Sequence, residues 1–104
     1  MAKYLFVYHG GKKPVSEEEV AKVMHAWGEW FGSMGPAVVD GGNPVGQSST
    51  VNADGSVSDD GGANPAIAYS LIEAPSLDNA VSKAQACPIL KSGGSVELAE
   101  AFDL

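Results

Sequence analysis

Apolar side chains dominate residues 3–9, where aromatic and β-branched types predict a strand. Its alternate positions form two apolar sides, one aromatic and one aliphatic: Tyr4, Phe6 and Tyr8 against Leu5 and Val7. A lone two-layer domain covers only one side of its sheet. The pattern therefore predicts that a second copy of the chain covers the other side, so that the protein is a homodimer.

A helix is predicted to begin after Ser16, because this residue and the glutamates that follow it, up to Glu19, form a capping box. Apolar residues then recur at helical spacing until Gly35-Pro36 ends the pattern. This apolar stripe comprises Val20, Val23, Met24, Trp27, Phe31 and Met34, with Trp30 at its edge. Each indole either anchors the core or forms the wall of a cleft.

Three more main strands and a second helix complete the pattern. The strands are expected at residues 37–40, 66–73 and 95–102, and the helix between Ser76 and Pro88. Residues 41–66 hold six of the thirteen glycines and predict an irregular segment with a short hairpin around Asp54-Gly55. This order predicts an α+β fold of ferredoxin-like βαββαβ organisation, an antiparallel sheet with two helices on one face.

Length and charge narrow the class of protein. A chain of 104 residues has no room for a second core, so residues 1–104 are expected to form a single domain. The formal charge is −7 and all six basic residues are lysines, so the bidentate arginine contacts typical of nucleic-acid binding are missing. We expect no nucleic-acid partner, and we interpret Lys12 and Lys13 as a solvated turn.

Cysteine content and the start of the chain bear on the compartment. Cys87 is the single cysteine, which excludes an internal disulfide and a thiolate-rich metal site and fits a reducing compartment. The first apolar run is too short for a signal peptide or a membrane span. We expect a cytoplasmic protein without a membrane partner.

The strongest candidate for chemistry is Asp40, which ends a strand beside Gly41-Gly42 and Asn43. Glycines let a ligand or a backbone approach closely, and the Asn43 amide adds a donor and an acceptor. In a partly apolar cleft the Asp40 carboxylate would serve as a general base. The alternative is that Asp40 and Asn43 only hydrogen-bond the backbone of their own turn.

Three further side chains enter the list of candidates. His9 ends the first strand, where it is either a solvated cap or part of a site. Tyr69 either presents its hydroxyl to a ligand or buries its ring in the sheet. His25 lies on the first predicted helix. The two histidines do not form an i, i+4 pair and the acidic residues lack calcium-loop spacing, so we expect no metal. The glycines of residues 41–46 lack the spacing of a dinucleotide fingerprint, and we expect no cofactor.

Six segments together resemble the YCII-related (DGPF) family over nearly the whole chain. They are Met24-His-Ala-Trp27, Val39-Asp-Gly-Gly-Asn-Pro44, Tyr69-Ser-Leu-Ile-Glu-Ala74, Ser76-Leu-Asp-Asn-Ala80, Cys87-Pro88 and Gly94-Ser-Val-Glu97. The resemblance implies a dimeric α+β barrel, in which two four-stranded sheets pack face to face. It also implies a small enzyme with a His and Asp pair for acid–base work, and some relatives are encoded beside alternative sigma factors.

The chain departs from that family in two places. It has Asp60-Gly61-Gly62-Ala63 where longer relatives show Asp-Gly-Pro-Phe. The family's helix histidine falls near His25, which projects away from the apolar stripe and is expected to be exposed.

Two functions follow as hypotheses. The first is a cofactor-free enzyme of lyase or isomerase type that moves a proton on a small organic substrate held between sheet and helix. Asp40 would be its base, Trp27 its wall, Asn43, Tyr69 and Gly42 further substrate contacts, and His9 and His25 candidate partners. The second is a non-catalytic dimer that binds a small molecule or regulates a protein such as a sigma factor.

Overall fold

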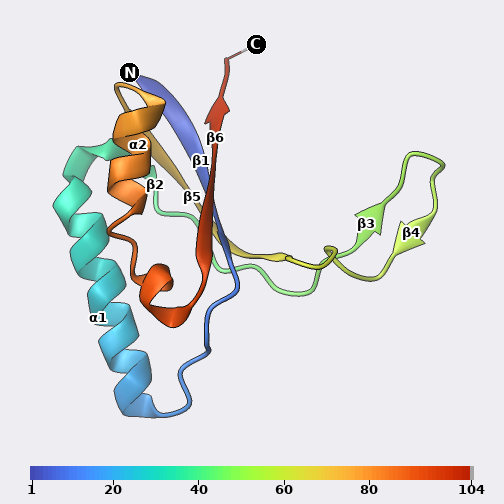
Figure 1. Cartoon of the computed structure of the whole chain (residues 1–104), viewed down its shortest axis with the longest axis horizontal. Coiled ribbons are helices and arrows are strands. Elements are labelled where there is room, and N and C mark those ends of the chain that lie inside the picture. Colours follow the sequence, from blue (N-terminus) through green and yellow to red (C-terminus); the bar gives the residue numbers. More distant parts are fainter. Residues whose placement is uncertain (104) are drawn as a thin grey trace.

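The computed structural model describes residues 1–103 and confirms the predicted α+β class. Two α-helices, two short 3₁₀ segments and six strands follow one another along the described chain (Figure 1). In order they are β1 (Ala2–His9), α1 (Glu17–Met34), a 3₁₀ turn (Gly35–Ala37), β2 (Val38–Asp40), β3 (Thr50–Val51), β4 (Val57–Ser58), β5 (Ala66–Ala74), α2 (Leu77–Ala84), a second 3₁₀ turn (Pro88–Ser92) and β6 (Ser95–Ala101). Every predicted helix and strand, including the short hairpin, is present.

The main sheet has four strands in the order β2-β5-β1-β6, and each neighbouring pair is antiparallel. Strand β1 therefore lies inside the sheet, between β5 and β6. Both helices lie on the same face of this sheet (Figure 1), as the sequence predicts. The helices leave the other face of the sheet uncovered in the single chain.

Both helices begin at the predicted serines. The Ser16 hydroxyl oxygen accepts a hydrogen bond from the Glu19 amide at 3.1 Å. The Glu19 carboxylate in turn accepts one from the amide of Val15 at 2.9 Å, one residue before the cap itself. Ser76 caps α2 in the same way, through the amide of Asn79 at 3.1 Å. These side chains satisfy amides that a helix start leaves without partners.

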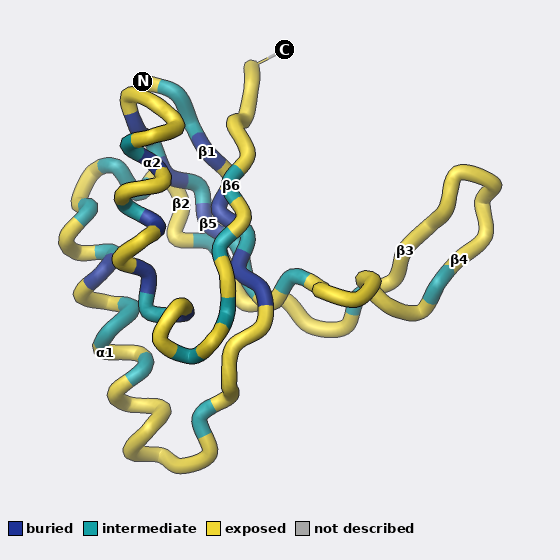
Figure 2. Tube along the Cα trace, in the orientation of Figure 1, coloured by how far each residue is buried: buried dark blue, intermediate teal, exposed yellow. Residues whose placement is uncertain are grey.

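The core lies between the sheet and the helices (Figure 2). It includes the aromatic side of β1, with Phe6 fully buried. Trp30, expected at the edge of the apolar stripe, is the buried residue of α1, and its indole N–H donates to the carbonyl of Lys83 in α2 at 3.0 Å. Met24, expected within the stripe, is 69% exposed. Trp30 also packs against Phe6 and Tyr8 of β1, so the buried side of α1 includes the edge of the predicted stripe.

The uncovered face of the sheet carries the aliphatic side of β1. Leu5 is 37% exposed, and Val7 beside it is only half-buried. On the flanking strands, Leu71 and Ala99 lie directly opposite Leu5 and add to the same apolar surface.

Residues 46–65, which we call the arm, project from the body of the protein. The last ladder contacts before it are the Pro44–Ala68 bridge and the hydrogen bond from the Val45 amide to the Ile67 carbonyl. Within the arm β3 and β4 pair with each other, and the ribbon projects away from the helices (Figure 1). Gly55 turns the ribbon with a φ of 87°, a conformation that the Asp-Gly sequence predicts.

No helix within residues 1–103 is both long enough and apolar enough to span a lipid bilayer.

Candidate functional site

Two adjoining cavities share the indole of Trp27 as a wall. The larger, of about 780 Å³, lies between the β1–α1 loop, α1 and the base of the arm. The smaller, of about 260 Å³, lies between α1 and the segment that runs from β2 along the edge of β5. Together they form what we call the Trp27 cleft.

Trp27 is held in this position by aromatic packing. Its ring meets Tyr8 edge-on, with the centroids 4.9 Å apart, and Trp30 in the same way at 5.6 Å. Phe31, one helical turn further along α1, packs against it at 5.9 Å. Trp27 is therefore both a core contact and a cleft wall, and its two interpretations from the sequence do not exclude each other.

The walls of the larger cavity are mainly apolar, and charged side chains lie at the loops that border it. Aliphatic surface comes from four separate segments of the chain, through Val23, Val45, Ile67 and Ile89. Lys12 and Lys13 come from the β1–α1 loop, and Asp59 and Asp60 from the base of the arm. Among the residues that the structure describes, neither histidine lines this cavity.

Polar groups of the smaller cavity are already engaged with one another. The Tyr8 hydroxyl donates to Ser70 Oγ at 2.9 Å, and the Ser70 hydroxyl donates to the Gly41 carbonyl at 2.7 Å. Burial raises the pKa of Tyr8 above its ordinary value, so the phenol stays protonated. The Asn43 amide donates to the Tyr69 hydroxyl at 3.1 Å, so these two predicted substrate contacts lie together at this cavity.

Gly42 has a structural reason to be glycine. Its φ is 77°, and a Cβ at this position would lie 1.7 Å from the carbonyl oxygen of Tyr69. The sequence suggested close approach of a ligand or a backbone, and here it is the backbone of β5 that approaches.

Asp40 lies outside both cavities and is exposed. Its carboxylate accepts a hydrogen bond from the amide of Gly42 at 2.8 Å, which is the turn contact expected of an Asx residue. No hydrogen bond or ion pair joins Asp40 to His9 or His25 within residues 1–103.

His25 lies on the exposed surface of α1. Its Nε2 is 2.9 Å from a carboxylate oxygen of Glu29, one turn along the helix, and both side chains are more than 70% exposed. The exposure expected from the helical wheel is therefore present.

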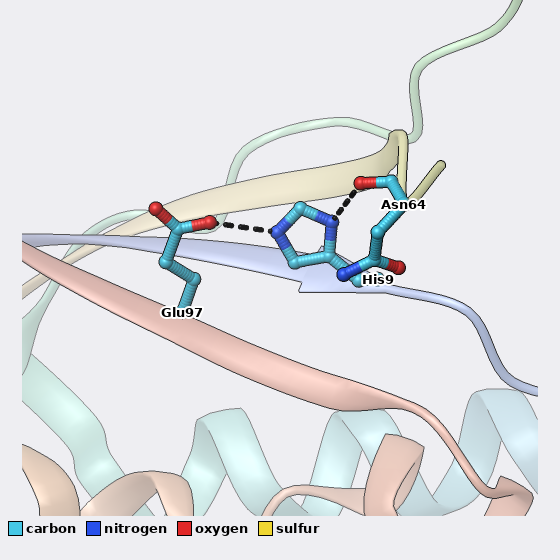
Figure 3. Close-up of polar contacts among 3 residues, drawn as sticks. All are labelled: His9, Asn64 and Glu97. Atoms are coloured by element: carbon cyan, nitrogen blue, oxygen red, sulfur yellow. Dashed lines mark hydrogen bonds and ion pairs between the residues drawn. The ribbon is translucent and has the colours of Figure 1, made fainter. Parts of the chain in front are cut away.

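His9 lies on the uncovered face of the sheet and is held on both sides (Figure 3). Its Nε2 is 2.9 Å from a Glu97 carboxylate oxygen, and its Nδ1 is 2.9 Å from the Asn64 carbonyl oxygen. Both partners are hydrogen-bond acceptors, so a ring nitrogen that carries a hydrogen donates to the partner it faces. The His9 side chain is 11% exposed and that of Glu97 is 66% exposed.

No protein-family model, curated protein or solved structure matches the chain. The resemblance to the YCII-related family therefore remains a prediction.

Glu97 did not emerge as a candidate from the sequence. It is 88 residues from His9, and the two meet only because β6 pairs with β1. The signal was present in the alternation of the strands, since Glu97 pairs with Val7 and so shares the aliphatic side of β1.

Cys87 is buried, and burial raises the pKa of its thiol to about 11. A thiol in that state is a poor nucleophile. Within residues 1–103, no three His, Cys, Asp or Glu side chains gather closely enough to hold a metal ion.

Proposed function

We propose that the chain is a non-catalytic, homodimeric small-molecule-binding module, with its ligand in the Trp27 cleft. The observation that carries this proposal is that Asp40, His9 and His25 all lie outside the cavities that Trp27 walls. A general base must reach the proton it removes. A binding site needs only an apolar cavity with a few polar groups.

The cleft indicates the chemistry of the ligand. A cavity of about 780 Å³ is in the ordinary range for small-molecule sites. Trp27 and the aliphatic walls favour an aromatic or otherwise apolar body. Lys12 and Lys13 favour an anionic group of the ligand at the opening of the larger cavity. Asp59 and Asp60 disfavour a second anionic group on the same ligand. A small aromatic monocarboxylate meets these requirements.

The dimer is supported by the sheet. The antiparallel order β2-β5-β1-β6 supports the ferredoxin-like organisation expected from the sequence. In a dimeric α+β barrel the uncovered faces of two such sheets would pack together and bury Leu5, Val7 and Leu71. The resemblance to the YCII-related family supports the same arrangement.

The enzyme hypothesis keeps one specific observation in its favour. His9 and Glu97 form a close imidazole–carboxylate pair, a combination that often serves in acid–base chemistry. A cofactor-free lyase or isomerase would then work from the uncovered sheet face, not from Asp40. Its substrate would bind near His9 and away from Trp27.

Titration with benzoate, followed by amide NMR spectra and Trp fluorescence, separates these functions. We expect saturable shifts in residues 44–46 and at Trp27, and weaker binding in a Lys12→Gln, Lys13→Gln double variant. Lys22→Gln, on the exposed surface of α1, is the matched control and should bind like the wild type. Saturable shifts confined to His9 and Glu97 would support the enzyme hypothesis, and no saturable shift with either benzoate or phenol would exclude the proposed ligand class.

A further inference from the structure

The arm has one apolar surface and one polar surface. Val51 and Val57 are directly paired across the ribbon, so their side chains leave it on the same side. They are 70% and 61% exposed. The other pair, Thr50 and Ser58, is polar, and the Asn52 amide donates to Ser58 Oγ at 3.3 Å.

The β3–β4 ribbon of the arm is not part of the main sheet. Its strands pair only with each other, and an isolated two-stranded ribbon is marginally stable in water. Internal hydrogen bonds tie its two limbs together, such as the one from Thr50 Oγ1 to the Asp60 carbonyl at 2.6 Å. A surface outside the chain that buried these two valines would stabilise the ribbon.

The chain exposes more surface than is expected for a folded monomer of its mass. Its accessible surface is 6979 Å², against about 5,500 Å² expected for a folded monomer of 10.7 kDa. The radius of gyration is 15.0 Å, against about 13 Å for a compact domain of this length. The excess of roughly 1,500 Å² exceeds the ~800 Å² that each partner buries in a standard stable interface.

The charge of the uncovered face suits a second copy of the same chain. The chain as a whole carries −7 and the arm contains three Asp and no basic residue. The uncovered face pairs Lys3 with Glu73 and His9 with Glu97. Two copies that meet on this face therefore avoid the repulsion that their acidic surfaces would cause elsewhere.

The arm projects on the same side of the molecule as the uncovered face, opposite the helices (Figure 1). A partner seated on that face would lie within the angle between sheet and arm. In a two-fold symmetric dimer each arm would contact the other copy. The same association would therefore bury both arms.

We propose that the arm clasps a second copy of this chain, with Val51 and Val57 buried against the partner's body. The clasp rests on the homodimer of the proposed function and adds a second, separate contact to it. The sheet faces supply the central contact and the arms supply the outer one.

Sedimentation equilibrium of wild type, Val51→Ser with Val57→Ser, and Leu5→Lys tests the clasp separately from the dimer. Loss of two buried valines should raise the dimer dissociation constant at least about tenfold. Val15→Ser, an 88% exposed valine outside the arm, is the matched control and should leave the constant unchanged. Circular dichroism of each variant establishes that the body remains folded.

A mixed sample of ¹³C-labelled and unlabelled protein gives a direct readout. Intermolecular NOEs from the methyl groups of Val51 and Val57 would support the clasp. A wild-type dimer that dissociates in Leu5→Lys but is unaffected by the valine double variant would overturn the clasp and leave the dimer standing. A wild-type protein that stays monomeric at NMR concentrations would overturn both, whereas benzoate binding to that monomer would preserve the ligand site.

Discussion

His9 and Glu97 meet at 2.9 Å across two neighbouring strands, and His25 and Glu29 meet at the same distance along one helix. The first imidazole is buried within the sheet surface, and the second lies in water. The His9 ring also reaches the carbonyl of Asn64, at the end of the arm. The His9 ring in β1 therefore connects β6 with the arm. The exposed pair of His25 and Glu29 connects only two turns of α1.

Replacement of each histidine by alanine should separate these two roles. His9→Ala leaves the Asn64 carbonyl without this partner and should lower the free energy of unfolding by about 1–3 kcal/mol. His25→Ala removes an exposed contact with Glu29 and should change the free energy of unfolding by less than about 0.5 kcal/mol. Urea unfolding at neutral pH measures both, and equal losses in the two variants would contradict the structural role of His9.

Gly42→Ala should be strongly destabilising. A Cβ would lie 1.7 Å from the Tyr69 carbonyl oxygen, at a φ of 77° that L-residues rarely adopt. Because backbone must move to relieve this overlap, we expect a loss of at least about 2 kcal/mol in the free energy of unfolding. Gly46→Ala is the control, since its Cβ would meet nothing within 4 Å. Similar stability of the two variants would show that the β2–β5 edge is not packed as described.

The stability of the protein should fall above pH 10 partly because of Tyr8. Burial raises the pKa of this phenol above 10, so deprotonation is easier in the unfolded chain. The contribution of Tyr8 to stability is fully present below pH 10. It is lost as the pH rises from the pKa of the phenol in the unfolded chain to its higher pKa in the folded protein. Tyr8→Phe removes this loss, at a cost of about 1 kcal/mol for the bond to Ser70.

Urea unfolding at pH 8 and pH 11 checks the alkaline effect. Wild type should lose more stability between the two pH values than Tyr8→Phe, while some loss remains because burial also raises the pKa of Cys87 to about 11. Equal losses in both proteins would mean that the Tyr8 phenol is accessible to solvent.

The Cys87 thiol should react slowly with Ellman's reagent in the native protein. It is 2% exposed, and at pH 8 its raised pKa leaves little thiolate. In urea the same thiol should react at the rate of a free cysteine. Rapid reaction of the native protein would contradict the burial of this side chain.

Local sequence determined the elements of this protein. Ser16 and Ser76 supply caps that act within three residues, and the alternation in residues 3–9 separates an aromatic side from an aliphatic one. Such signals depend only on near neighbours and on the period of helix or strand. For that reason they predicted the order of strands and helices and the hairpin at Asp54-Gly55.

Tertiary structure decided the contacts between those elements. Contacts with Phe6 and Tyr8 of β1 bury Trp30, whereas Met24 is exposed, although both lie near one apolar stripe. Pairing of β6 with β1 brings Glu97 to His9 across 88 residues, and the approach of β5 explains Gly42. No local period encodes these distances, because each depends on which surfaces bury the most apolar area once the whole chain has folded.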